Sequence, residues 1–296
     1  MAKNILHMMT PLPHISPFDV NMAIDAGYEA TVSYTGVLLE EVTGLVQDAM
    51  FSRSPRDATR TAVFIGGKDA LLALDMLDAA SKALLKPFEI SLFADPAGSF
   101  TTAAAMIAVV EKTLREKKGR ELRGAAVSVF GATGVVGTAS GVIAALEGAS
   151  VTFVARDETE RTARHAAEVN RKFGVNIAVA DGSTPEKRTA ILAATEVALC
   201  AAKAGVRVLD LAQIAKATKL LVAADVNAVP PLGIEGLDLH ANGAPLGEHG
   251  ALGVGALAIG NVKYRTESGL FKQMTESKSP LRLDFRQAFA LARTLA

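Results

Sequence analysis

Short apolar runs alternate with longer amphipathic segments along the whole chain, and this alternation predicts strands and helices in turn. Glycine and proline separate most of the segments. Helices between successive strands are typical of parallel sheets covered on both faces, so the pattern predicts an α/β fold. In the first half, strands are expected at Asn4–Met9, Ala30–Tyr34, Ala62–Ile65 and Phe88–Ala94, and helices at Phe18–Ala26, Leu38–Phe51, Asp69–Leu85 and Thr101–Leu114.

The second half repeats the alternation after one strongly charged run, Arg115–Arg123, which we interpret as a solvated helix end and a linker. We therefore expect a first domain at residues 1–115 and a second at 116–263, with residues 264–296 packing back on the first. Strands are expected at Ala125–Phe130, Val151–Ala155, Asn176–Ala180, Glu196–Ala202 and Leu220–Ala224, and helices at Val135–Leu146, Glu158–Phe173, Thr184–Ala194, Val208–Ala217, Lys263–Met274 and Asp284–Leu295.

A turn with three evenly spaced glycines follows the first strand of the second domain. Gly131 allows a tight turn, Gly134 lets a pyrophosphate approach the backbone, and Gly137 lets the next helix lie close to the sheet. The N-terminus of that helix offers N–H groups to phosphates. The spacing differs from G-x-G-x-x-G, and a turn that binds nothing is the alternative, but the flanking strand and helix favour a Rossmann-like, doubly wound dinucleotide-binding domain. The expected contacts are Gly131, Thr133, Gly134, Val135, Val136 and Gly137.

Arg156 and Asp157 follow the second strand of this domain, where the adenosine ribose is recognised. A carboxylate there binds the 2′-hydroxyl of NAD and an arginine accommodates the 2′-phosphate of NADP, so the pair leans towards NADP without excluding NAD. Asp157 could also cap the next helix. Further cofactor contacts are expected where later strands end: Ala201, Ala202, Asp225 and Asn227. The loop that holds the last two has two prolines and could equally be a rigid connector.

Three loops of the first domain follow strand ends, where ligands bind in open α/β sheets: Thr10–Asp19, Gly66–Asp69 and Asp95–Thr102. Asp95 could accept two hydrogen bonds from an amidine-like edge, such as that of an aminopyrimidine ring. A purely structural role, capping the next helix, is weighed evenly against it. The expected substrate contacts are Asp95, Gly98, Ser99, Thr101 and Thr102, and the positioning candidates are Asp19, Lys68 and Asp95.

Composition narrows the function classes. The 296 residues are half hydrophobic with a net charge of zero, so nothing indicates a nucleic-acid or membrane-surface partner. The single cysteine, Cys200, excludes a disulfide framework and is expected to be a buried strand residue. The five histidines lack metal-ligand spacing, so no metal is expected. Without a signal peptide or an apolar run of about 18 residues, the protein is expected to be soluble and cytoplasmic.

Several blocks of sequence together resemble one known family, the bacterial methylene-tetrahydromethanopterin dehydrogenases, which are NAD(P)-dependent enzymes of one-carbon metabolism in methylotrophs. Arg156–Asp157 is similar to the form that uses both NAD and NADP. A more distant resemblance is to methylene-tetrahydrofolate dehydrogenase/cyclohydrolase, whose cyclohydrolase lysine has no convincing counterpart here. The blocks are IGGKD (Ile65–Asp69), DPAGSFTTAAA (Asp95–Ala105), VFGATGVVG (Val129–Gly137), DVNAVPPLGIEGLD (Asp225–Asp238) and GALGVGAL (Gly250–Leu257).

The resemblance implies hydride transfer from N5,N10-methylene-tetrahydromethanopterin to NAD(P)+, giving the methenyl form, as a step of formaldehyde oxidation. The pterin would lie on the first domain and NADP or NAD on the second. The two nitrogens beside the bridge carbon stabilise the cation, so the reaction needs positioning rather than acid–base groups, and no catalytic residue is assigned with certainty. Small-residue stretches at Thr101–Ala108 and Gly250–Gly260 lead us to expect a homo-oligomer.

Three alternatives stay open at this point. The substrate could be methylene-tetrahydrofolate on the same two-domain plan. A shikimate- or amino-acid-type dehydrogenase would need a catalytic Lys–Asp pair, for which Lys68–Asp69 is the nearest candidate. A non-catalytic NAD(P)-binding sensor would bind the dinucleotide without turnover, although the absence of a DNA-reading element counts against a regulator of transcription.

Overall fold

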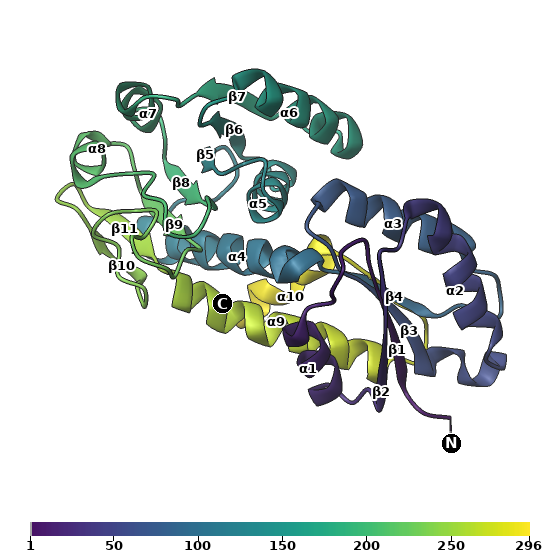
Figure 1. The fold of residues 1–296 in the computed structure, drawn as a ribbon. Coiled ribbons are helices and arrows are strands. Elements are labelled where there is room, and N and C mark those ends of the chain that lie inside the picture. The colour runs from purple at the N-terminus through teal and green to yellow at the C-terminus, as the bar shows by residue number, and fades with distance from the viewer. Residues whose placement is uncertain (1) are drawn as a thin grey trace. The chain divides into compact units, whose positions relative to one another are not determined.

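The computed structural model describes residues 2–296 and divides the chain into two compact units. The first unit comprises the residues up to Thr101 together with Tyr264–Leu291, and the second comprises Thr102–Lys263 with Ala292–Ala296. Each unit is built on its own sheet with helices around it (Figure 1). The division at Thr101 lies near the start of helix α4 (Ser99–Lys118), whereas the boundary expected after residue 115 lies near its end.

The sheet of the first unit has five parallel strands in the order β2-β1-β3-β4-β12. The chain moves outward from β1 to β2 and then returns to the other side of β1 to form β3, so the direction of winding reverses between β1 and β3. The elements are β1 (Ile5–Thr10), α1 (Pro17–Asp25), β2 (Ala30–Thr35), α2 (Val42–Phe51), β3 (Thr61–Ile65), α3 (Ala70–Ala83), β4 (Ser91–Ala94) and β12 (Arg282–Leu283), and α4 begins here and continues into the second unit.

Burial along these strands explains their positions. Every residue of β3 and β4 is buried, whereas β2 lies at the edge of the sheet and is largely exposed. Figure 1 shows α1 and α9 (Ala256–Glu276) on one side of the strands and α2 and α3 on the other. Phe271 of α9 packs on Phe64 and Phe93, with ring centroids 5.6 and 5.2 Å away. The later part of α9 therefore belongs to the core of this unit.

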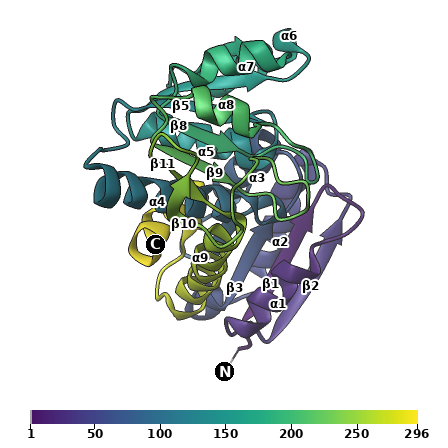
Figure 2. The same ribbon diagram turned by 90° about the vertical axis from the view of Figure 1, so that its left-hand side faces the viewer.

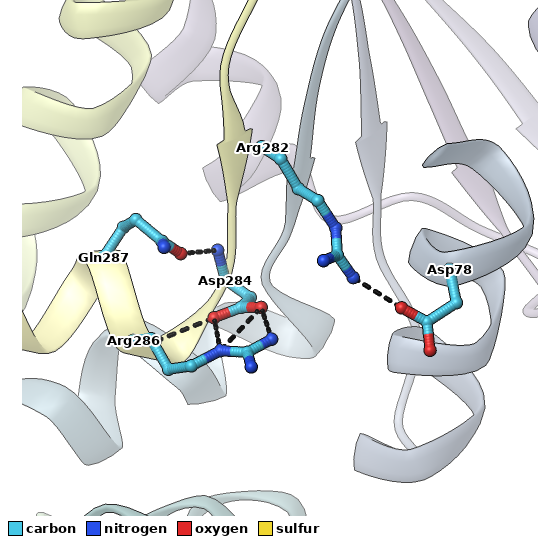
Figure 3. A network of polar contacts seen from close by, with 5 residues as sticks. All are labelled: Asp78, Arg282, Asp284, Arg286 and Gln287. Carbon is cyan, nitrogen blue, oxygen red and sulfur yellow. Dashed lines mark hydrogen bonds and ion pairs between the residues drawn. The ribbon is translucent and has the colours of Figure 1, made fainter. Parts of the chain in front are cut away.

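The short strand β12 was not predicted from the sequence, because two residues carry no periodicity. It pairs with β4, and Arg282 forms an ion pair with Asp78 of α3. Directly after it, the carboxylate of Asp284 accepts hydrogen bonds from the backbone and the guanidinium of Arg286, and Gln287 accepts one from the Asp284 backbone (Figure 3). These contacts form the N-terminal cap of α10 (Phe285–Leu295).

The second unit holds a seven-stranded sheet in the order β7-β6-β5-β8-β9-β11-β10, parallel except for β10. This is the order of doubly wound dinucleotide-binding domains, and its winding reverses between β5 and β8. Helices α5 and α6 cover one side of its strands, and α7 and α8 cover the other (Figure 1). Figure 2 shows the same strands from a second direction. The elements are β5 (Ala126–Phe130), α5 (Val135–Leu146), β6 (Ser150–Ala155), α6 (Thr159–Phe173), β7 (Ala178–Asp181), α7 (Pro185–Leu192), β8 (Val197–Cys200), α8 (Leu211–Lys216), β9 (Val222–Asp225), β10 (Asn242–Leu246) and β11 (Ala251–Val254).

The expected α/β fold with two parallel-sheet units is confirmed, and α5 has the expected bounds. Two details were not predicted. Helix α4 extends four residues beyond the expected end to Lys118, so the charged run Arg115–Arg123 contains the helix end and the linker that follows it, and the basic residues of the last turn complement the negative end of the helix dipole. The glycine-rich stretch Gly250–Gly260 contains strand β11 and the first turn of α9, and β10 pairs with β11 in an antiparallel hairpin. The glycines of this stretch interrupt the apolar pattern of both the strand and the first turn of the helix, so neither was predicted.

Candidate functional site

The glycine turn after β5 has the geometry that a phosphate-binding turn needs. Gly131 has φ +79°, a conformation that side chains rarely adopt. A Cβ atom on Gly137 would lie 2.3 Å from the carbonyl oxygen of Gly131, so only glycine lets α5 begin this close to the turn. Gly134 is the N-cap of α5 and no side chain caps the helix. The first N–H groups of this 12-residue helix have no intrahelical acceptors, so the turn presents donors to an anion.

A cavity of about 450 Å³ opens at this turn, at the carboxyl ends of β5, β6 and β8. It lies where the winding of the sheet reverses, which is where doubly wound domains bind ligands. Of the residues expected to contact a cofactor, the cavity is lined by Gly131, Thr133, Gly134, Arg156, Asp157, Ala201 and Ala202. Val135, Val136 and Gly137 form the first turn of α5 beside it.

The two walls of this cavity lie close together at Gly131. A Cβ atom on Gly131 would lie 2.4 Å from the carbonyl oxygen of Ala201, so the chain after β8 is pressed against the turn. Across the cavity, Arg156 and Asp157 are exposed at the end of β6. Asp157 accepts a hydrogen bond of 3.0 Å from the backbone of Glu158. The structure thus brings the glycine turn, the small residues after β8 and the Arg–Asp pair around one volume.

Asp225 and Asn227, which were expected to contact the cofactor, lie outside the lining of this cavity and bond within their own loop. Asp225 is buried and its carboxylate accepts backbone hydrogen bonds from Asn227, Gly233 and Ile234. Burial raises the pKa of Asp225, and these three hydrogen bonds oppose the rise. Asn227 in turn accepts a hydrogen bond from the backbone of Val229. Neither residue lines the cavity, and both hold the proline-rich loop after β9 in place.

Nine lining residues were not among the expected cofactor contacts, and they include Gly182 and three cationic residues, Arg188, Lys203 and Arg207. Arg188 lies on α7, and Arg207 forms a 2.5 Å ion pair with Glu235. Lys203 directly follows Ala202 in the chain, and its positive charge next to two expected cofactor contacts was the available signal. Arg188 gave no signal, because a single arginine within a polar helix is usually a solvated surface residue.

A second cavity, of about 280 Å³, lies in the first unit at the ends of β1 and β3, where that sheet reverses its winding. Two of the three loops selected from the sequence, those after β1 and β3, form most of its wall. Asp19 is buried at its edge and Lys68 is exposed there. Thr10, His14, Ser16 and the backbone of Gly66 and Gly67 complete the polar part of the lining.

The third loop contributes only Ala97 to this cavity. Asp95 is fully buried, and its carboxylate accepts hydrogen bonds from the backbone N–H groups of Phe100 and Thr101 and from the Thr101 hydroxyl. Asp95 therefore caps α4. Gly98, Ser99 and Thr102 belong to the same helix start and do not line the cavity. Asp69 likewise caps α3, through Leu71 and Leu72, so the Lys68–Asp69 pair is not arranged as a catalytic pair.

Comparison with known proteins decides the family. The chain is 51% identical, over all of its 296 residues and the whole length of the relative, to a protein of Methylorubrum extorquens named NAD(P)-dependent methylenetetrahydromethanopterin dehydrogenase. The family described as methylene-tetrahydromethanopterin dehydrogenase, N-terminal, matches residues 17–97. The chain belongs to the methylenetetrahydromethanopterin dehydrogenase family. This confirms the resemblance read from the sequence motifs.

One further relative and two solved structures are also similar to this chain. A second protein of the same organism, named bifunctional protein MdtA, is 30% identical over the full length of both chains. Among solved structures, shikimate 5-dehydrogenase from Listeria monocytogenes shares 13% identity, with a TM-score of 0.51 over 99% of this chain and 96% of its own. Ornithine transcarbamoylase from Giardia lamblia shares 11% identity, with a TM-score of 0.52 over 94% of this chain and 88% of its own. These two likenesses show the fold alone.

Within residues 2–296, no group of three or more His, Cys, Asp or Glu side chains is arranged to hold a metal ion. None of the helices described is both long enough and apolar enough to cross a membrane.

Proposed function

We propose that this protein transfers a hydride from N5,N10-methylene-tetrahydromethanopterin to NAD(P)+ and releases the methenyl form, as a step in formaldehyde oxidation. The observation that carries the proposal is the 51% identity, over the whole of both chains, to a protein named for this activity. The match of residues 17–97 to the family of the same name supports it independently of the nucleotide-binding half.

The cofactor, NADP or NAD, is placed in the cavity of the second unit. The glycine turn and the start of α5 would hold the pyrophosphate, and Arg156 and Asp157 would face the adenosine ribose. The turn fits the group because its glycines let the start of α5 lie close to it, and no side chain caps the N–H groups of that helix start. When bound, the oxidised nicotinamide accepts the hydride. Ala201 and Ala202 leave room for it beside the turn.

We place the pterin in the cavity of the first unit and revise the expected contacts. Asp95, Gly98, Ser99, Thr101 and Thr102 were the expected substrate residues, but Asp95 is committed to capping α4. Asp19 and Lys68, proposed from the sequence as positioning residues, line this cavity instead. A carboxylate there suits the aminopyrimidine edge of a pterin, and a lysine suits its carbonyl oxygen. Both groups act by binding and orienting.

The chemistry makes few demands beyond orientation. The methylene carbon lies between two nitrogens whose lone pairs stabilise the cation left by the departing hydride, so no general base is required. The enzyme has to hold the donor carbon about 3–3.5 Å from the acceptor carbon and exclude water. The buried cysteine is consistent with this: burial raises the pKa of Cys200, which keeps it a thiol without a catalytic role.

We also propose a cytoplasmic location and a homo-oligomeric state. A lone buried cysteine fits a reducing compartment. The small-residue stretch Thr101–Ala108 that prompted the second proposal is mostly buried in α4, so it supports close helix packing at least as well as subunit contacts. Light scattering of the purified protein measures the oligomeric state.

The decisive experiment is an assay of the purified protein with methylene-tetrahydromethanopterin and methylene-tetrahydrofolate in parallel, each with NAD+ and NADP+. We expect reduced nicotinamide to appear with the methanopterin substrate and at most slow reduction with the folate. Faster turnover of the folate would favour the alternative substrate. Binding of the dinucleotide with no turnover of either pterin would favour the sensor.

A further inference from the structure

The lining of the second-unit cavity carries more positive charge than a pyrophosphate site requires. It contains one carboxylate, Asp157, and four cations, Arg156, Arg188, Lys203 and Arg207. Arg207 is neutralised by Glu235 through the 2.5 Å ion pair. The helix start and the glycine turn already supply donors for the pyrophosphate, so the remaining cations can serve a further anionic group.

Arg188 is held in place by a contact that leaves its guanidinium incompletely bonded. One terminal nitrogen, Nη1, donates a 2.9 Å hydrogen bond to the carbonyl oxygen of Gly182. The Nε atom is buried, and within residues 2–296 it has no hydrogen-bond acceptor. A buried donor of this kind is costly unless it is satisfied, and Arg188 lines the cavity, from which an acceptor can come.

Gly182 places this guanidinium beside the end of β6. Its backbone N–H donates to the carbonyl oxygen of Ala155, the last residue of β6. A Cβ atom at Gly182 would lie 2.4 Å from Cγ1 of Val154 and 3.3 Å from Cγ of Arg188. The absence of a side chain therefore lets the arginine stem lie against β6. Arg156 and Asp157, the expected ribose contacts, follow that strand directly.

We infer that Arg188 is a specificity-determining residue that binds the 2′-phosphate of NADP together with Arg156. The inference rests on the proposed placement of the dinucleotide. A guanidinium with one nitrogen anchored and its other donors available matches the geometry of a phosphate. Asp157, on the same wall, binds the 2′-hydroxyl of NAD and repels a phosphate. A second arginine offsets that repulsion, which explains how one pocket with an aspartate accepts both cofactors.

The inference is tested by calorimetry with two cofactor fragments, 2′,5′-ADP and 5′-AMP, which differ only in the 2′-phosphate. Arg188→Met should weaken binding of 2′,5′-ADP about tenfold and change binding of 5′-AMP less than about twofold. Arg188→Lys keeps the charge without the forked donors and should fall between. The matched control is Arg164→Met, on the exposed face of α6, where the arginine side chain is 75% exposed; it should change neither affinity.

Two results of these measurements would overturn the inference. Equal weakening of both fragments would assign Arg188 to a part of the nucleotide that they share, the adenine, the ribose or the 5′-phosphate, and no weakening would leave it structural. If Arg188→Met does not fold, as judged by thermal unfolding, Arg188→Lys carries the comparison alone. These measurements need no pterin, so they are separable from the proposed function. A protein that binds 2′,5′-ADP through Arg188 but oxidises no pterin keeps this inference and loses the proposed activity.

Discussion

The hydroxyl group of Thr101 donates a hydrogen bond of 2.6 Å to the carboxylate of Asp95, and both side chains are buried. The other carboxylate oxygen of Asp95 accepts backbone hydrogen bonds from Phe100, at 2.7 Å, and from Thr101, at 3.2 Å. Both carboxylate oxygens of Asp95 thus cap the N-terminus of α4.

This arrangement predicts a structural phenotype for Asp95→Ala. Loss of three hydrogen bonds to a buried carboxylate should lower the free energy of unfolding by about 3 kcal/mol, measured in urea. Thr101→Val should cost about 1 kcal/mol, and Thr101→Ser should be close to neutral because it keeps the hydroxyl. A large rise in the KM for the pterin at unchanged stability would instead show that Asp95 contacts the substrate.

A second prediction concerns the contact between Gly137 and the glycine turn. Because a Cβ at this position would lie 2.3 Å from the Gly131 carbonyl oxygen, Gly137→Ala should displace the turn and raise the Kd for both NAD+ and NADP+ at least about tenfold. Gly260→Ala is the control, since no atom lies within 4 Å of the new methyl group and the residue is helical. It should raise stability by about 0.5–1 kcal/mol. Equal cofactor affinity in both variants would contradict the assigned role of the turn.

A third prediction separates the two cofactors at Arg156. Its exposed guanidinium lines the cavity at the end of β6, so Arg156→Ala should raise the KM for NADP+ about tenfold and the KM for NAD+ much less. Steady-state kinetics with each cofactor at saturating pterin measures both values. Equal effects on the two cofactors would remove Arg156 from recognition of the 2′-phosphate.

The sequence allowed the fold to be predicted wherever local periodicity and burial agree. Strand β5 and helix α5 are mostly apolar and flank a glycine turn, and their positions were predicted closely. Strand β12 was missed because its pairing is set by a partner far along the chain: it pairs with β4, more than 180 residues earlier. Strand β10 pairs with the nearby β11 and was missed for a local reason, since glycine and proline interrupt its sequence. A two-residue strand has no pattern of its own to detect.

The candidate site likewise contains residues that the local sequence revealed and residues that only the fold brings to it. The turn at Gly131 is local in sequence and was found, whereas Arg188 reaches the cavity from α7 only because the sheet sets β7 beside β6. Asp225 and Asp95 each follow a strand and have the residue type of a ligand contact, but each binds backbone N–H groups of its own loop or helix. Sequence position alone does not separate a carboxylate that binds a ligand from one that holds a loop.

A fourth prediction tests the substrate cavity through Lys68. Lys68→Met removes an exposed cation from the wall that also holds Asp19. It should raise the KM for the pterin about tenfold and leave the KM for NAD(P)+ unchanged, because the cofactor cavity belongs to the other unit. Lys82→Met, on an exposed position of α3 outside the cavity, is the matched control and should change neither constant. A change confined to the cofactor KM would contradict the placement of the pterin.

The last prediction concerns the ion pair between Arg120 and Glu196, which ties the start of β8 to the segment before β5. Arg120 Nε lies 3.2 Å from Glu196 Oε1, and Nη2 lies 3.3 Å from Oε2, which also accepts the backbone N–H of Ala126 at 2.8 Å. The hydrogen bonds from Arg120 lower the pKa of Glu196 below its ordinary 4.5, and burial opposes them. A lowered carboxyl pKa stabilises the folded state at pH values above the unfolded pKa. That stabilisation is lost as the pH falls below about 4.5, towards the folded pKa.

Arg120→Met should therefore lower the free energy of unfolding by about 1 kcal/mol at neutral pH, a modest value because both side chains are partly exposed. The difference between native and variant protein should shrink as the pH falls below about 4.5, because protonated Glu196 no longer attracts the guanidinium. Urea unfolding at a series of pH values measures it. Glu196→Gln removes the titrating carboxylate, so its free energy of unfolding should also approach that of the native protein as the pH falls below about 4.5. If the difference in the free energy of unfolding between native protein and Arg120→Met stays constant down to acid pH, Arg120 stabilises the protein by packing alone.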